Sequence, residues 1–249
     1  MLNASINILK AVQKLKMSKF RNLEQKFIVE GDKMILESIQ SVPDQIQAIF
    51  ITDNTKLSSE ILTNYLTYKI SVNDLERISS HKNPQHSLAV VGSTFKVQKS
   101  NKDQLVLICD GIQDPGNFGT IIRTADWFGI QSIVASKNTV DRFNPKVIQA
   151  SMGSIYRVDV TYENIVDWLR SSNRLKLATT LAGDSLYNFK TDQDLALIIG
   201  NEGNGVSPEV LEIIDYKVTI PGHGKAESLN ASVASGIVIA HLTKLFYHD

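Results

Sequence analysis

The residues most suggestive of chemistry follow an apolar run at 105–109, where the segment 114–117, Asp-Pro-Gly-Asn, leads toward Arg123. Asp-Pro-Gly is a tight-turn signal, so the backbone should reverse there and leave Asn117 at the start of a helix. On such a helix Asn117, Thr120 and Arg123 are three residues apart and share one side. An amide can hold a ribose oxygen and a guanidinium fork suits phosphate. A helix cap plus a surface charge would explain the same two residues equally well.

A second loop, residues 200–205 with the sequence Gly-Asn-Glu-Gly-Asn-Gly, follows an apolar run at 195–199. Three glycines in six positions leave the main chain open to a flat ligand. Glu202 is the only charge in the loop. A flexible turn before a capped helix is the alternative, although it would need fewer glycines.

A third loop begins where an expected strand ends at Ile220, and it continues through a glycine-flanked segment to Ser228. Ser228 is placed to cap a helix whose first turns are rich in Ala, Ser and Gly, which permits close backbone approach. Ser228 and Asn230 would serve as cap residues in a purely structural interpretation. That interpretation is compatible with a functional one.

Several familiar sites are excluded by spacing. Gly116 is not followed by Gly-Lys-Ser/Thr, so the first loop is no P-loop, and a dinucleotide fingerprint is also absent, which argues against a Rossmann oxidoreductase. The five histidines lack the spacing of a zinc site, and Gly-x-Ser-x-Gly does not occur. We therefore expect no metal.

Composition indicates an ordinary globular protein, with 43% apolar and 21% charged residues. The single cysteine, Cys109, cannot form an internal disulfide and reads as core filler rather than nucleophile. No apolar stretch is long enough for a membrane span and no signal peptide is recognisable. These features favour a cytoplasmic protein.

The zero net charge hides an asymmetry. Residues 1–100 carry 13 Lys/Arg against 9 Asp/Glu, whereas residues 101–249 carry 13 against 17. Most of the positive excess precedes Glu37, which suggests a polyanionic partner for the first segment. A solvated helix face is the alternative.

The elements that must position the loops alternate along the chain. In the second part, strands are expected at 105–109, 131–135, 157–160, 175–180, 195–199 and 216–220, with helices at about 117–128, 144–151, 162–171, 208–214 and 229–246. This alternation predicts an α/β fold with a mostly parallel sheet and helices on both faces. The three loops then lie at carboxyl ends of strands, where ligands bind.

The first part reads as a smaller α/β unit. Helices are expected near 8–15 and from Gly31 through Ile39, the latter preceded by the apolar segment 27–29, and strands at 48–51 and 88–92 with helical material between them. The polar segment 96–103 is the expected linker. The predicted domains are thus 1–95 and 104–249.

Taken together and in this order, the three loops resemble the signature motifs of the SpoU (TrmH-like) RNA 2′-O-ribose methyltransferases, a branch of the SPOUT superfamily. The similarity covers about residues 104–246. Residues 17–38 and 83–92 also resemble that family's N-terminal substrate-binding domain, which is similar to ribosomal protein L30e. The resemblance implies a deep trefoil knot, a homodimer, and S-adenosylmethionine as cofactor.

The resemblance also assigns residues where positions match the family motifs. It implies catalytic roles for Asn117, Arg123, Glu202, Ser228 and Asn230. It implies cofactor contacts, largely through main chain, at Thr180, Leu181, Gly200, Asn201, Gly203, Ile220, Pro221 and Leu229. The Gly-His-Gly run at 222–224 departs from the family's usual pattern.

The implied reaction is S-adenosylmethionine-dependent 2′-O-methylation of structured RNA, with ribosomal RNA favoured over transfer RNA. A guanidinium with a pKa above about 12 is a poor proton acceptor, so we expect Arg123 to clamp phosphate rather than act as base. Asn117 would orient the ribose, and the basic first segment, with Lys19 and Arg21 leading, would hold RNA. A catalytically inactive RNA-binding protein of the same fold is the alternative.

Overall fold

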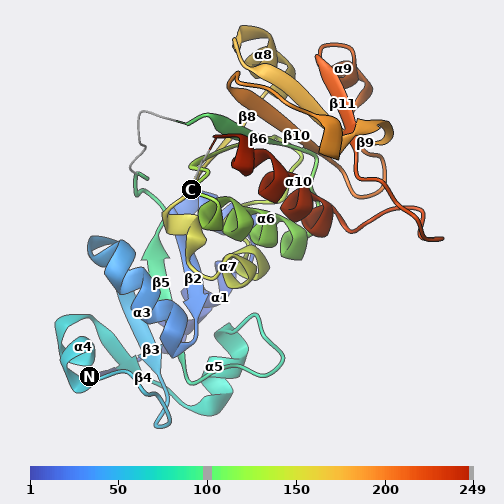
Figure 1. Cartoon of the computed structure of the whole chain (residues 1–249). Helices are drawn as coiled ribbons and strands as arrows, with labels where there is room; N and C mark the ends of the chain where they lie inside the picture. Colours follow the sequence, from blue (N-terminus) through green and yellow to red (C-terminus); the bar gives the residue numbers. More distant parts are fainter. Residues whose placement is uncertain (98–102, 247–249) are drawn as a thin grey trace. The chain divides into compact units, whose positions relative to one another are not determined.

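The computed structural model describes residues 1–97 and 103–246, which form two compact units (Figure 1). Unit 1 comprises Met1–Lys96 and Phe143–Tyr156, and unit 2 comprises Val97–Arg142 and the chain from Arg157 onward. Most of the linker expected at 96–103 lies outside the described residues. The chain therefore passes between the units three times.

Unit 1 is built on a five-stranded mixed sheet with the order β1-β4-β3-β5-β2. Its strands are β1 (Leu2–Asn3), β2 (Lys26–Glu30), β3 (Ile46–Ile51), β4 (Thr67–Lys69) and β5 (Ser87–Gly92). Its helices are α1 (Ile6–Lys14), α2 (Ser18–Glu24), α3 (Asp32–Ser41), α4 (Ser59–Asn64), α5 (Val72–Ile78) and α7 (Pro145–Ser151). The strands expected at 48–51 and 88–92 and both expected helices are confirmed.

Besides the two-residue strand β1, two strands of unit 1 were not anticipated. The segment that was expected only to lead into a helix is strand β2, whose residues 27–29 are all buried and pair antiparallel with β5. Strand β4 lies within the region that was expected to be helical, and it is held by parallel pairing with β3. Both strands are short, and pairing with distant segments determines them more than local pattern does.

The segment Phe143–Tyr156 contributes to the core of unit 1. Its helix α7 packs against β2, and the ring of Phe143 stacks on Phe27 with the ring centroids 4.5 Å apart. At the end of the segment, the hydroxyl groups of Tyr156 and Ser38 share a hydrogen bond of 2.7 Å. The helix that was expected at 144–151 is thus present, and it belongs to unit 1.

Unit 2 is built on a six-stranded sheet with the order β11-β9-β10-β6-β7-β8, and every neighbouring pair is parallel. Its strands are β6 (Leu105–Asp110), β7 (Ser132–Ser136), β8 (Asp159–Glu163), β9 (Leu175–Ser185), β10 (Leu195–Gly200) and β11 (Tyr216–Thr219). Its helices are α6 (Pro115–Trp127), α8 (Ile165–Ser171), α9 (Pro208–Leu211) and α10 (Ala231–Phe246). The predicted α/β fold with a parallel sheet is confirmed.

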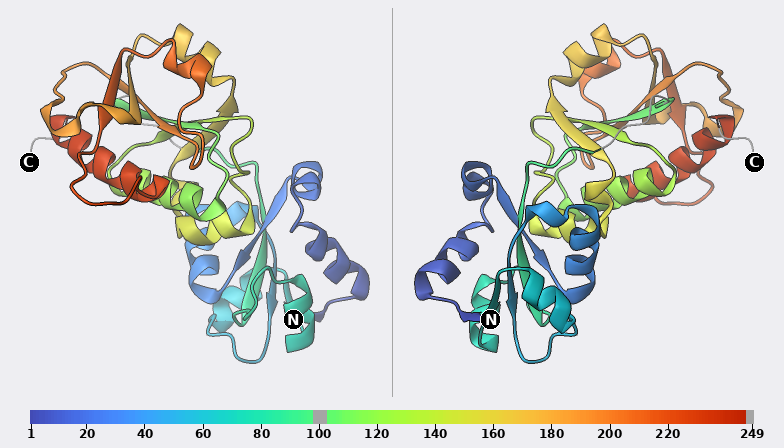
Figure 2. Two further views of the ribbon diagram at one scale, coloured as in Figure 1. Left: turned by 90° about the vertical axis from the view of Figure 1, so that its right-hand side faces the viewer. Right: turned by 90° about the vertical axis from the view of Figure 1, so that its left-hand side faces the viewer.

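Helices cover both faces of this sheet. Helices α8 and α9 lie on one face, and α6 and α10 run side by side on the other (Figures 1 and 2). The central strands β6 and β10 are therefore apolar along nearly their whole length, as strands buried on both faces must be. No helix among the described residues is long and apolar enough to cross a membrane.

Strand β9 is longer than expected and irregular. Its pairing with β11 passes from Ala178 and Lys217 directly to Asp184 and Val218, so residues 179–183 leave the ladder as a bulge. At Gly183, a side-chain carbon would lie 2.7 Å from the carbonyl oxygen of Lys217, so only glycine permits this close approach.

Candidate active site

The first two loops leave the sheet from adjacent points. Strands β6 and β10 are parallel neighbours, and their last residues, Asp110 and Gly200, are register partners. From β6 the chain continues to β7 and β8 on one side, whereas β9 and β11 lie beyond β10 on the other. The carboxyl ends of β6 and β10 thus form a topological switch point, where open parallel sheets bind ligands.

Hydrogen bonds between side chains join all three loops. The side-chain amide of Asn117, in the first turn of α6, donates to Oε1 of Glu202 over 3.1 Å. The amide of Asn230, just before α10, donates to Oδ1 of Asn117 over 2.9 Å. Asn117 is 9% exposed and stands at the centre of this chain of contacts. Three segments far apart in the sequence therefore converge on one place.

Glu202 also binds main chain of the first loop. Its two carboxylate oxygens accept hydrogen bonds from the amides of Gln113 and Asp114, each over 3.3 Å. The side chain of Asp114 in turn accepts a hydrogen bond from the main-chain amide of Asn117 over 2.8 Å, and it thereby caps helix α6. Through these hydrogen bonds Glu202 holds the second loop against the first loop.

Asn201 shapes the second loop. Its Oδ1 accepts hydrogen bonds from the amides of Gly203 and Asn204, and its Nδ2 donates to the carbonyl of Gly111 over 2.7 Å. At Gly200, a side-chain carbon would lie 2.3 Å from the main chain of Gly205. The glycine that sequence analysis linked to ligand access is therefore required for the loop to fold back on itself.

The third loop differs from its expected form. Helix α10 begins at Ala231, and the side chain of Asn230 caps it by accepting from the amides of Ser232 and Val233. The expectation that Ser228 caps this helix is wrong, because Ser228 is exposed and lies before the cap. Its hydroxyl makes no hydrogen bond to another described residue, and is therefore accessible to a ligand.

Arg123 lies on the exposed side of α6, two turns beyond Asn117. Among the described residues it has no ion pair, and its guanidinium is solvated. The hydroxyl of Thr120 between them is used within the helix, where it donates to the carbonyl of Gly116 over 2.8 Å. Arg123 is thus a cation whose charge is not neutralised by a described neighbour.

Two of the segments implied as cofactor contacts, the bulge of β9 and the third loop, are half-buried to exposed. Thr180 and Leu181 lie in the bulge of β9, with Leu181 78% exposed. In the third loop, the main-chain amides of residues 220–230 donate no hydrogen bond to another described residue. This stretch includes Ile220, Pro221 and Leu229. Pro221 has no N–H to donate, and the carbonyl of Asn230 accepts from the amide of Ala234 over 2.9 Å, so the peptide groups of residues 220–229 are the ones free to bind a ligand.

Three supporting residues were missed in the sequence. The hydroxyl of Ser136, at the end of β7, accepts from the amide of Gly111 over 2.8 Å, and Thr139 donates to the carbonyl of Cys109 over 3.1 Å. The buried Asp110 accepts from the amide of Ser207 over 2.7 Å. Short polar residues at the end of a buried strand, or within a few residues of it, were the signal that could have indicated them.

Two other kinds of site, a cysteine nucleophile and a metal centre, can be compared with the structure. Burial raises the pKa of the Cys109 thiol, and the nearby charges of Asp110 and Glu202 raise it further, so its thiolate is disfavoured. Within residues 1–97 and 103–246, no three His, Cys, Asp or Glu side chains gather as a metal site would require.

The two basic residues assigned to RNA in unit 1 differ. Lys19 is exposed, as expected. Arg21 is only 3% exposed, and its guanidinium donates to the carbonyls of Leu15 and Lys16 at the end of α1. The expectation that Arg21 belongs to an open basic face is wrong, because its charge satisfies the carbonyl end of a helix.

Two family models match the sequence. Residues 104–240 match the SpoU rRNA Methylase family, and residues 7–89 match an MRM3-like substrate binding domain. The first range contains all three loops described above.

Known proteins resemble nearly the whole chain. The 23S rRNA (guanosine(2553)-2′-O)-methyltransferase RlmP of Bacillus subtilis is 33% identical over 234 residues, which cover 92% of this chain and 93% of RlmP. A putative RNA methyltransferase of the TrmH family from Porphyromonas gingivalis is 34% identical, with a TM-score of 0.80 over 96% of this chain and 97% of that one. An AdoMet-bound rRNA methyltransferase from Sinorhizobium meliloti, 23% identical, shares the fold with a TM-score of 0.86 over 100% of this chain and 98% of that one.

Proposed function

The chain belongs to the SpoU rRNA methylase family, and on that premise we propose that it transfers the methyl group of S-adenosylmethionine to a ribose 2′-hydroxyl of ribosomal RNA. The observation that carries the proposal is the chain of hydrogen bonds from Asn230 through Asn117 to Glu202. It brings the three motif loops to one place at the carboxyl ends of parallel strands.

The exposed loops fit an adenosine-type cofactor. A flat, polar ring system needs main-chain donors and acceptors that the protein does not itself use, and residues 220–229 supply them. Main chain at Gly200, Asn201 and Gly203, the β9 bulge at Thr180 and Leu181, and residues Ile220, Pro221 and Leu229 would hold it. When bound, S-adenosylmethionine supplies an activated methyl group on a sulfonium, so the protein has mainly to align the acceptor oxygen.

The remaining site residues have distinct tasks in this proposal. Arg123, which has no described ion-pair partner, binds a phosphate next to the target ribose. Asn117 is held by two hydrogen bonds and orients the ribose from its fixed position. The free hydroxyl of Ser228 contacts the substrate, and Glu202 and Asn230 hold the loops around it.

Homodimer formation belongs to the same proposal. Helices α6 and α10 lie side by side and expose two large apolar side chains, Trp127 at 84% and Val233 at 52%. Exposed apolar surface on packed helices favours association with a second copy. The trefoil knot, the cytoplasmic location and the domain bounds 1–95 and 104–249 remain predictions from the sequence.

The test is methyl transfer itself. Purified protein is incubated with labelled S-adenosylmethionine and either ribosomal or transfer RNA from cells lacking this protein, and the label is mapped to single nucleotides. We expect one 2′-O-methylated position in ribosomal RNA. Cofactor binding without incorporation into either RNA would instead establish the catalytically inactive RNA-binding alternative.

A further inference from the structure

Three loops of unit 1 meet at one edge of its sheet. Strands β2 and β3 are both antiparallel to β5, which lies between them, so the carboxyl ends of β2 and β3 and the start of β5 lie at the same edge. The segments at this edge are the start of helix α3 at residues 31–33 and the loops 52–57 and 79–86. We call these residues the loop face.

Asp32 ties two parts of the loop face together. Its carboxylate accepts hydrogen bonds from the Thr55 hydroxyl over 2.9 Å, the Lys56 amide over 2.7 Å and the Ser87 hydroxyl. Burial alone would raise the pKa of Asp32, but these hydrogen bonds, helped by the nearby charge of His86, outweigh it and lower the pKa. The negative charge is therefore present and directed inward.

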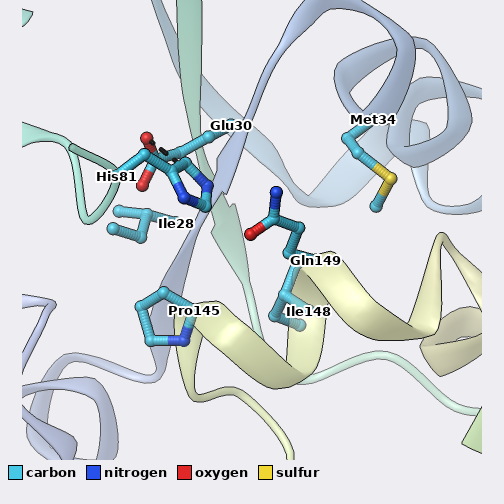
Figure 3. Close-up of a pocket in the computed structure, with 7 residues that line it drawn as sticks. All are labelled: Ile28, Glu30, Met34, His81, Pro145, Ile148 and Gln149. Carbon is cyan, nitrogen blue, oxygen red and sulfur yellow. Dashed lines mark ion pairs between the residues drawn. The ribbon is translucent and has the colours of Figure 1, made fainter. Parts of the chain in front are cut away.

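Glu30 holds the loop at residues 79–86 in place. Its side chain is only 5% exposed and accepts hydrogen bonds from the Ser80 amide over 2.8 Å and from the Ser79 hydroxyl. The Nε2 atom of His81 lies 4.0 Å from the same carboxylate (Figure 3). Thus Glu30 and Asp32, on either side of Gly31, fix all three loops.

The charge that remains on the surface is positive. Lys33 in the first turn of α3 and Lys56 and Lys82 on the two loops are exposed, and among the described residues none of them has an ion pair. His86 is also exposed there. The exposed carboxylate of the region, Asp53, is already paired with Lys69. A rigid set of separated lysines without carboxylate partners is suited to the phosphates of a folded RNA.

The first helices are less suited than their sequence suggested. Arg21 is buried, the ammonium group of Lys16 donates to the carbonyl of Arg77 over 2.8 Å, and that of Lys14 lies 5.4 Å from the ring centre of Phe20. Much of the positive charge before residue 37 therefore stabilises unit 1 itself.

We propose that the loop face is the RNA-contacting surface of unit 1, with Lys33, Lys56 and Lys82 binding phosphates and Glu30 and Asp32 as positioning residues. The inference rests on the proposed function, because it assigns part of the substrate contact for that reaction. It assigns this contact to other elements than helices α1 and α2.

The test compares two triple variants that remove the same charge. Lys33→Ala/Lys56→Ala/Lys82→Ala removes the loop-face lysines, whereas Lys190→Ala/Lys217→Ala/Lys244→Ala removes three exposed lysines of unit 2. Affinity of the whole protein for its ribosomal RNA substrate is measured by fluorescence anisotropy over a range of salt concentrations. We expect only the first triple to reduce the slope of log affinity against log salt, by about 2 to 3.

A second measurement separates positioning from folding. In Asp32→Asn the KM for RNA should rise at least tenfold while the KM for S-adenosylmethionine stays at the wild-type value. A general folding defect would change both. If the two triple variants had equal salt slopes, the proposal that the loop face binds RNA would be wrong, whatever their methyl-transfer activity. Wild-type protein that binds RNA with the expected slope but methylates none would overturn the proposed function and leave the loop face standing.

Discussion

The side-chain amide of Asn230 donates to that of Asn117 over 2.9 Å, across 113 positions of sequence. The same Asn230 caps helix α10 through its oxygen, so one side chain both starts a helix and holds the first motif loop. The side-chain amide of Asn117 donates in turn to the carboxylate of Glu202. Helix placement and site geometry therefore depend on a common residue.

Asn230 can be dissected by two substitutions. Asn230→Ser keeps a cap oxygen but loses the donor to Asn117, whereas Asn230→Ala loses both. We expect Asn230→Ala to lower the free energy of unfolding by about 0.5–2 kcal/mol, and Asn230→Ser to lower it by only a small part of that. Both should lose methyl transfer. An active Asn230→Ser protein would show that the contact with Asn117 is dispensable.

Arg123→Ala should lower methyl transfer about 100-fold, because the acceptor ribose is then poorly positioned. Affinity for S-adenosylmethionine, measured by calorimetry, should stay unchanged, since the proposed partner of Arg123 is a phosphate. Arg170→Ala removes an exposed arginine from the last turn of α8 and serves as the matched control. An equal loss of cofactor affinity in Arg123→Ala would contradict the clamp.

Gly200→Ala should prevent the second loop from folding back, since the added carbon meets main chain at 2.3 Å. Overpacking of this kind costs about 1–3 kcal/mol, and the melting temperature and cofactor affinity should fall together. Gly236→Ala, in helix α10, is the control, because no atom lies within 4 Å of the added carbon. Normal cofactor binding by Gly200→Ala would show that the loop tolerates another shape.

The lowered pKa of Asp32 predicts a specific acid sensitivity. A carboxyl with a lower pKa in the folded state adds stability above its unfolded pKa of about 3.9, and that stability is lost as pH falls through the folded value. Urea unfolding of wild type and Asp32→Asn should therefore differ at pH 7 and converge below about pH 4. A constant difference across this range would exclude the carboxylate charge as the cause.

Ser136→Ala tests a residue outside the motifs. It leaves the amide of Gly111 without its acceptor, at the start of the loop that leads to Asn117. We expect kcat to fall while the KM values for RNA and cofactor change little, because binding groups remain in place. Ser171→Ala, on the exposed end of α8, is the control. An unchanged kcat would limit Ser136 to a structural role.

The parallel sheet of unit 2 could be predicted because its strands are buried on both faces and read as unbroken apolar runs, as in 105–109 and 195–199. Strand β2 could not, because its three apolar residues become a strand only through pairing with β5, about sixty residues away. Within the site, the loops were located by their glycines. The contacts of Glu202 with main chain and the burial of Arg21 depend on tertiary packing that no local pattern reports.

The excursion of residues 143–156 into unit 1 has a consequence for any attempt to divide this protein. A cut in the segment 96–103 would release a first fragment that lacks Phe143 and Tyr156, so Phe27 would lose its stacked ring and Ser38 its hydrogen bond to Tyr156. The second fragment would carry α7 with its apolar side uncovered. Topologically, unit 1 is a discontinuous fold completed by an insertion between β7 and β8, so the two halves are expected to behave as one unit in expression and in evolution.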